Sequence, residues 1–130
     1  MTERFRPHHI LCERFLMLAF PERGEEYARM KRKAVEVVGS QEDTLVEAIE
    51  GVDDICCSCS NCRDDRCEST AGDEGAVRKW DAIILKGLGV ICGETRTAGE
   101  WRALINEKAP LSFCTSRCPF RAKCTITEPR

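Results

Sequence analysis

The sequence predicts a small, mainly α-helical domain, with at most a short strand or hairpin (which would make it α+β) and two cysteine-rich loops that bind metal. Three observations support this fold class. The chain has 130 residues, the length of one domain, and we expect residues 1–130 to form a single unit. Apolar residues recur at helical spacing in several segments. Ten residues are cysteine, most of them in two short segments, and a bound inorganic centre would stabilise a chain with a modest apolar core.

The first predicted helix begins at Pro7, where the missing N–H of proline is harmless, and ends at Pro21. One face of this helix carries apolar residues at intervals of three and four, which predicts that the face is buried. Its members are His8, Leu11, Cys12, Phe15 and Leu18.

A second helix is predicted from Glu25 to Val38, with Gly39 just past its end. The basic run RMKRK, residues 29–33, is interpreted as the solvated face of this helix. The buried stripe of the helix is expected to comprise Tyr27, Met30, Ala34, Val37 and Val38.

The segment DTLVEAIEGVDD, residues 43–54, is compatible with helix or strand, and we favour a short strand because Gly51 and two aspartates end it abruptly. A third helix is predicted over GAVRKWDAIILKGLG, residues 75–89, with Gly89 as the residue after its end. Its core positions are Val77, Trp80, Ile84 and Leu88.

The fourth helix has a capping-box signature, in which Thr97 is followed three residues later by Glu100. It is expected to stop near Pro110 and to bury Trp101, Leu104 and Ile105. Trp80 and Trp101 are both interpreted as core residues with no further role. The remaining tail, LSFCTSRCPFRAKC, is expected to be a thiol-rich loop.

The charge pattern excludes several classes of partner. The formal net charge is −2, with 20 basic and 22 acidic residues well mixed, so neither a nucleic-acid nor a membrane surface is indicated. Glu13 and Arg14 interrupt the apolar N-terminal run, which is therefore neither a signal peptide nor a membrane span. We expect a cytoplasmic protein. In that reducing compartment clustered thiols are more often metal ligands than disulfides.

The first cysteine loop contains Cys56, Cys59 and Cys62 at C-x₂-C-x₂-C spacing, followed by Cys67. This run partly resembles the cluster-binding run of bacterial ferredoxins, although the last gap is four residues instead of three and no proline follows Cys67. Bound thiols must lose their protons, which nearby cations favour. Cationic side chains within the two cysteine loops are Arg63, Arg66, Arg117, Arg121 and Lys123.

The second cysteine loop contains Cys114, Cys118 and Cys124. Zinc is the main alternative to iron, because structural zinc takes two ligand pairs and Cys56/Cys59 with Cys114/Cys118 would supply them. That assignment leaves several other thiols unexplained. The number and clustering of the cysteines therefore favour one or two [4Fe–4S] clusters over a single zinc ion.

Together the motifs resemble an uncharacterised prokaryotic family, a domain of unknown function described as iron–sulfur binding and found largely in anaerobes. The resemblance comprises RPHH-x-x-C at the start, D-D-I-C-x₂-C in the middle, a helix ending in L-G, an E-W-x-x-L helix and a final three-cysteine loop, from Arg6 to Cys124. It implies that the ligands of the centre are Cys12, Cys56, Cys59, Cys67, Cys114, Cys118 and Cys124.

Several residues remain as less favoured ligands. Cys62 competes with Cys67, and we favour Cys67 because it matches the family pattern. Cys92 lies beside a glycine and is a weaker candidate ligand. His8 and His9 could reach the same centre as Cys12, although a capping or core hydrogen bond is the simpler role for a histidine there. Cys57 is interpreted as a spare thiol, and Asp53, Asp54, Asp64 and Asp65 as turn formers.

No serine–histidine or paired-carboxylate arrangement stands out, so the chain is not expected to be an enzyme on its own. The leading hypothesis is a small redox protein that exchanges electrons with an unidentified partner protein through one or two [4Fe–4S] centres. The alternatives are a zinc-stabilised interaction module and a cluster-bearing accessory subunit of a larger enzyme. The two cysteine loops are expected to converge near the N-terminus of the first helix.

Overall fold

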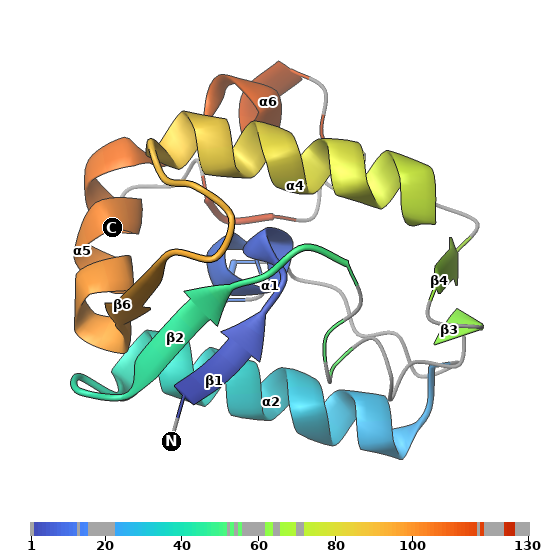
Figure 1. Cartoon of the computed structure of the whole chain (residues 1–130), viewed down its shortest axis with the longest axis horizontal. Coiled ribbons are helices and arrows are strands. Elements are labelled where there is room, and N and C mark those ends of the chain that lie inside the picture. The colour runs from blue at the N-terminus through green and yellow to red at the C-terminus, as the bar shows by residue number, and fades with distance from the viewer. Residues whose placement is uncertain are drawn as a thin grey trace.

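The computed structural model describes residues 2–12, 14–15, 23–51, 53, 55, 62–63, 66–69, 72–116, 118 and 124–126. They form a small α+β domain that is mostly helical, as the sequence predicts, with a short three-stranded mixed sheet. Helices α2 and α4 run along opposite sides of the molecule, with the short helix α1 between them (Figure 1).

The main sheet has the strand order β1-β2-β6. Strand β2 (Leu45–Ala48) confirms the predicted strand, and its buried positions are Val46 and Ala48. Strand β1 (Thr2–Phe5) pairs with β2 in parallel, and β6 (Thr95–Thr97) pairs with it in the antiparallel direction. Neither edge strand is predicted from the sequence, because each is too short to show an alternating pattern and is held by a partner distant in the chain.

The first helix is shorter than predicted. Helix α1 spans Pro7–Leu11, and Cys12 caps its C-terminal end. The Phe15 N–H bonds to the carbonyl oxygen of Cys12, three residues earlier, in a turn that follows the helix. The carbonyl oxygen of Phe15 then accepts hydrogen bonds from the backbone N–H and the hydroxyl of Thr125. These bonds attach the residues that follow α1 to the C-terminal segment. The predicted position Leu18 lies outside the described residues.

Helix α2 (Glu25–Ser40) extends slightly further than predicted, so Gly39 lies inside it. It packs against α5 (Ala98–Lys108), where the Arg102 guanidinium donates to the carbonyl oxygens of Val38 and Gln41. The predicted stripe of α2 is buried except at Met30, which is partly exposed and packs against the core.

Local signals correctly predict the ends of α4 and α5. Helix α4 (Glu74–Leu88) ends at Gly89, which has a φ of 74°, and Val90 N–H bonds to the Leu85 carbonyl oxygen in a Schellman arrangement. At the start of α5, Thr97 and Glu100 form both bonds of the predicted capping box. The tail is not a simple loop, because helix α6 (Ser112–Ser116) follows.

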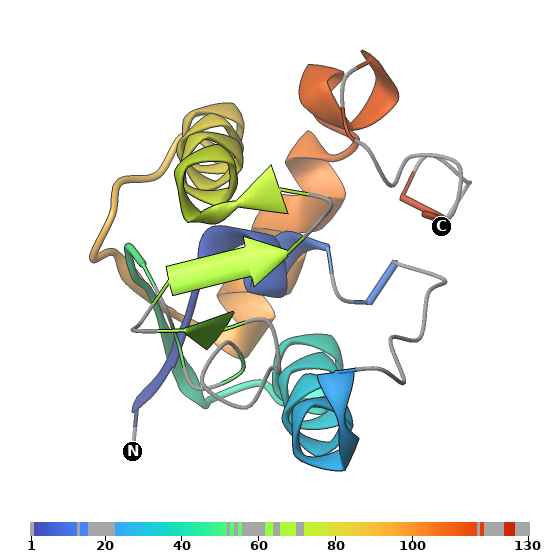
Figure 2. The same ribbon diagram turned by 90° about the vertical axis from the view of Figure 1, so that its right-hand side faces the viewer.

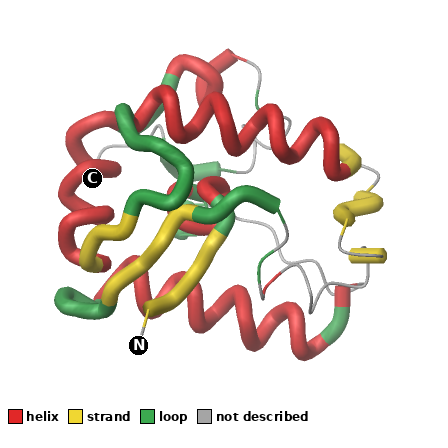
Figure 3. The backbone as a smooth tube through the Cα atoms, viewed as in Figure 1, coloured by secondary structure: helices red, strands yellow, loops and turns green. Residues whose placement is uncertain are grey.

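A second small sheet lies at the end of the molecule beside the N-terminus of α4 (Figures 2 and 3). It consists of β3 (Cys62–Arg63), β4 (Arg66–Ser69) and β5 (Gly72–Asp73), all antiparallel. The backbone register places Cys62 directly opposite Cys67. The sequence does not predict this sheet, since each strand is only two to four residues long.

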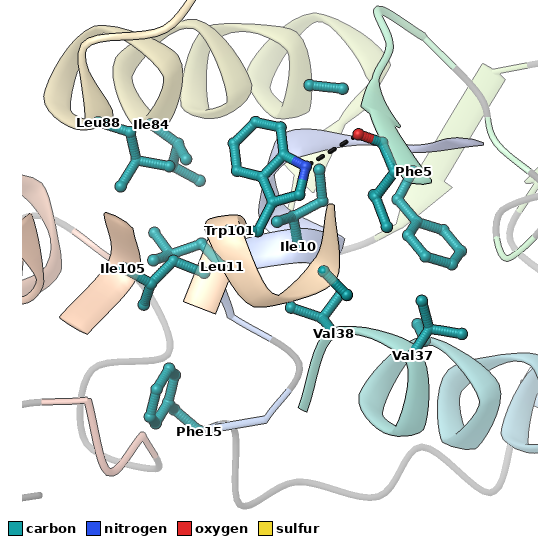
Figure 4. Close-up of a cluster of buried hydrophobic side chains, with 14 of the residues drawn as sticks. Phe5, Ile10, Leu11, Phe15, Val37, Val38, Ile84, Leu88, Trp101 and Ile105 are labelled. Carbon is teal, nitrogen blue, oxygen red and sulfur yellow. Dashed lines mark hydrogen bonds between the residues drawn. The ribbon is translucent and has the colours of Figure 1, made fainter. Parts of the chain in front are cut away.

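The hydrophobic core joins the main sheet to α1, α2, α4 and α5 (Figure 4). Trp101 is 1% exposed, and its indole N–H donates to the Val46 carbonyl oxygen at 2.9 Å, which links α5 to β2. Trp80 is only half-buried, so its predicted core role is wrong, and Asp81 takes the buried position next to it.

In the part of the chain that the structure describes, no helix is both long and apolar enough to cross a bilayer.

Candidate functional site

A buried charged network surrounds Arg6, the residue just before α1. The Arg6 side chain is fully buried, and its two terminal nitrogens donate to the carboxylate oxygens of Glu74 at 3.0 and 2.8 Å. Its Nε donates to Asp81 Oδ2 at 2.9 Å. Glu74 and Asp81 lie two turns apart on α4, on the same buried face as Ile84. One guanidinium therefore holds two buried carboxylates against the start of α1.

Each histidine of α1 contacts its own aspartate. His8 Nδ1 lies 2.7 Å from Asp81 Oδ1, which also accepts the His8 backbone N–H at 3.1 Å. His9 Nδ1 lies 2.5 Å from Asp53 Oδ2, which also accepts the Arg6 backbone N–H at 2.8 Å. A carboxylate oxygen accepts, so each ring carries a proton on Nδ1. The two ring centroids are 4.1 Å apart.

The electrostatics of the network keep Asp81 ionised. Burial acts to raise the pKa of the Asp81 carboxyl, but the charges and hydrogen bonds of His8 and Arg6 outweigh it, so the pKa is lowered. The sequence predicts Asp53 as a turn former. Asp53 is also buried, at 3% exposure, so it has a role inside the domain as well. The histidines do make the core hydrogen bonds expected as their simpler role.

Sequence reasoning missed this network because its members are distant in the chain. The available signals were an arginine and two histidines around the first helical residue, and acidic residues on the apolar stripe of α4. Asp81 follows Val77 by four residues and precedes Ile84 by three, so helical spacing places it on the buried face. A carboxylate in such a position requires a buried partner.

A second group consists of thiols near the other end of α1. Cys12 follows the last residue of α1, and Cys12, Cys114 and Cys124 all belong to or pack against the same hydrophobic cluster. Cys114 lies in α6, and the Cys118 N–H bonds to the Phe113 carbonyl oxygen at 3.0 Å, which folds the two cysteines into one turn. Cys124 precedes Thr125, whose bonds to Phe15 bring the C-terminal segment alongside the end of α1.

The thiols of the C-terminal segment influence one another. Burial raises the pKa of the Cys114 thiol, and the proximity of Cys118 and Cys124 raises it further, against two backbone hydrogen bonds that lower it. Burial also raises the pKa of Cys124, with Cys118 adding to the effect. A negative charge on Cys118 therefore disfavours deprotonation of both Cys114 and Cys124.

The remaining predicted cysteine ligands fall into three sets. Cys56 and Cys59, with the spare Cys57, lie outside the described residues, as do Asp54, Asp64, Asp65 and the cations Arg117, Arg121 and Lys123. Cys62 and Cys67 are described only by their facing backbone positions, which do not distinguish between them as ligands. Cys92 is exposed on the turn between α4 and β6.

Among the residues whose side chains the structure describes, no three Cys, His, Asp or Glu side chains form a group that could hold a metal ion as they stand. As they stand, Cys12, Cys114, Cys118 and Cys124 therefore do not form a ligand set, and ligation would require them to approach one another. The imidazoles, by contrast, are already oriented through Nδ1 by carboxylates.

The fold and these two groups of side chains define a small, cysteine-rich α+β domain with a buried histidine–carboxylate network. The chain belongs to the DUF1284 family, described as a protein of unknown function, whose sequence pattern matches residues 24–124. The match excludes the RPHH-x-x-C segment that contributed to the expected resemblance. No curated protein and no solved structure gave a significant match.

Proposed function

We propose that this protein binds a [4Fe–4S] cluster through cysteine thiolates and exchanges electrons with a partner protein. The observation that carries the proposal is that Cys118 lies near enough to raise the pKa of both the Cys114 and the Cys124 thiols. Cys12 packs on the same hydrophobic cluster. These residues supply the four thiolates that one cubane cluster requires.

Their surroundings suit a redox centre. Cys114 is 7% exposed and lies among apolar side chains, and such burial helps to set the potential of a cluster. The raised pKa values of Cys114 and Cys124 mean that ligation must displace protons from neutral thiols, which a cluster or metal ion achieves by its own charge. The cysteines of the first loop, Cys56, Cys59 and Cys67, are proposed ligands of the same or a second cluster.

Zinc remains the alternative occupant, because four thiolates also form a structural zinc site. In that case the protein would be a metal-stabilised interaction module. A cluster-bearing subunit of a larger enzyme would share the chemistry of the first proposal and differ only in its partner.

The test is anaerobic purification followed by assays for iron, acid-labile sulfide and zinc. We expect brown protein with equal amounts of iron and sulfide, and an electron paramagnetic resonance signal after reduction. Cys118→Ser should lower the iron content, and Cys59→Ser should do so if the first loop also ligates. The exposed Cys92→Ser is the matched control and should leave the iron content unchanged. Colourless protein with stoichiometric zinc would refute the redox proposal.

A further inference from the structure

The hairpin of the small sheet brings two cysteines to facing backbone positions. Strand β3 is antiparallel to β4, and Arg63 lies opposite Arg66 with only two residues between them in the sequence. Cys62 lies opposite Cys67, one pair further from the turn. In a hairpin with a two-residue turn, the pair beside the turn is of the hydrogen-bonded kind. Because the two kinds alternate along an antiparallel ladder, Cys62 and Cys67 occupy a pair of the non-hydrogen-bonded kind.

A pair of this kind has the backbone geometry that a disulfide needs. The Cα atoms of a non-hydrogen-bonded pair lie about 4.5 Å apart, and residues directly opposite each other share one face of the sheet. A disulfide joins residues whose Cα atoms are about 4.4–6.8 Å apart. A bond between Cys62 and Cys67 therefore requires no change of register.

The short loop between the two cysteines favours a reversible bond. A disulfide stabilises a fold less when the loop that it closes is shorter. Only four residues separate Cys62 from Cys67, so the two thiols are near each other even in the unfolded chain. By linkage, the fold protects such a bond only slightly against reduction, and the pair can exchange with other thiols.

The rest of the domain holds the hairpin in place. Strand β4 also pairs with β5, which leads directly into α4 (Figure 2). The first residue of α4, Glu74, is 2% exposed and accepts two hydrogen bonds from Arg6. An isolated two-stranded hairpin is only marginally stable, whereas this one belongs to a three-stranded sheet attached to the core. The register that sets Cys62 opposite Cys67 is therefore supported by the fold.

We propose that Cys62 and Cys67 are a dithiol–disulfide couple that reacts with small-molecule disulfides by thiol–disulfide exchange. The thiolate of one cysteine attacks a sulfur of the small disulfide and releases one small thiolate. The thiolate of the other cysteine then attacks the protein sulfur of this mixed disulfide, forms the Cys62–Cys67 bond and releases the second small thiolate. The protein dithiol loses two electrons and two protons, and the small disulfide takes up both and becomes two thiols.

This couple goes beyond the proposed function. The cluster proposed on Cys12 and the cysteines of the C-terminal segment uses neither thiol of the hairpin, so the couple does not depend on it. Cys67 cannot form this disulfide and bind a cluster at the same time, so its two roles exclude one another in any one molecule.

The experiment treats the full chain, as isolated and under anaerobic conditions, with an excess of oxidised glutathione. The remaining thiols are then alkylated, and the protein is digested with trypsin without reduction. Trypsin cleaves after Lys33, Arg63, Arg66 and Arg78. The disulfide should therefore appear as residues 34–63 joined to residues 67–78, with a mass lower by two hydrogen atoms than the sum of the two peptides. Dithiothreitol should separate the peptides again.

Two variants and one further measurement assign the bond. Cys62→Ser should abolish the joined peptide, whereas Cys57→Ser, the matched control in the same peptide, should leave its yield unchanged. Fragmentation of the joined peptide from the unmodified protein identifies its linked cysteines directly, which covers the case in which Cys62→Ser does not fold. A bond from Cys67 to any other cysteine, or no joined peptide at any excess of glutathione, would overturn the inference. The iron and sulfide contents test the proposed function separately, so the two proposals fail independently.

Discussion

Arg6 and Glu74, separated by 68 residues in the chain, form a buried ion pair with two hydrogen bonds of 3.0 and 2.8 Å. The pair joins the end of β1 to the first turn of α4. It therefore fixes where the two histidines of α1 lie relative to the carboxylates of α4.

Replacing Arg6 with methionine should destabilise the protein by about 3–5 kcal/mol, because Glu74 and Asp81 would remain buried without their shared cation. The free energy of unfolding from urea denaturation measures the loss. Arg4→Met is the matched control, since the Arg4 side chain is 70% exposed and pairs with Glu47 at the surface. Its effect should stay within about 0.5 kcal/mol. Equal losses of unfolding free energy for the two substitutions would show that the buried network stabilises the protein no more than a surface ion pair does.

Trp101→Phe should cost about 1–3 kcal/mol, because it leaves the Val46 carbonyl oxygen buried without its indole donor. The same denaturation experiment measures this loss. Trp80→Phe provides the comparison, since Trp80 is half-buried and lies outside the core cluster. A larger loss for Trp80 would mean that the buried face of α4 is assigned wrongly.

Stability at acid pH should depend on Asp81. The pKa of Asp81 is lowered in the folded state, so its contribution to stability is fully present above the unfolded value of about 3.9 and is lost as the pH falls through the folded pKa. Unfolding free energies measured between neutral and acid pH should fall less steeply for Asp81→Asn than for the unmodified protein. Identical slopes would indicate that the Asp81 carboxylate is not stabilised by His8 and Arg6.

The thiols of the metal-free protein should differ in reactivity. Cys92 is exposed, whereas Cys114 is buried and has a raised pKa, so it carries little reactive thiolate at neutral pH. Timed alkylation followed by peptide mass spectrometry should find Cys92 modified first and Cys114 and Cys124 much later. In denaturant the differences should disappear. Early modification of Cys114 under native conditions would contradict its buried position.

Much of the helical structure could be predicted because its signals are local. The capping box at Thr97, the αL glycine at position 89 and the apolar stripe of α2 each depend on residues a few positions apart. The same reasoning misplaced one face of α4, where Trp80 is half-buried and Asp81 is buried. Hydrophobicity alone predicts Trp80 as the buried residue of the two. Arg6 and His8 provide the partners that allow the Asp81 carboxylate to be buried instead.

The sequence by itself determined that this is a small domain, mostly helical, with its thiols concentrated in two segments, since helix periodicity and cysteine spacing are properties of neighbouring residues. Only the tertiary structure decided the rest: where α1 ends, how β1 and β6 join β2, and which acids meet Arg6, His8 and His9. These contacts span 44 to 75 residues along the chain for the charged network. No local pattern encodes them, because a charge can be buried only beside a partner that folding brings to it.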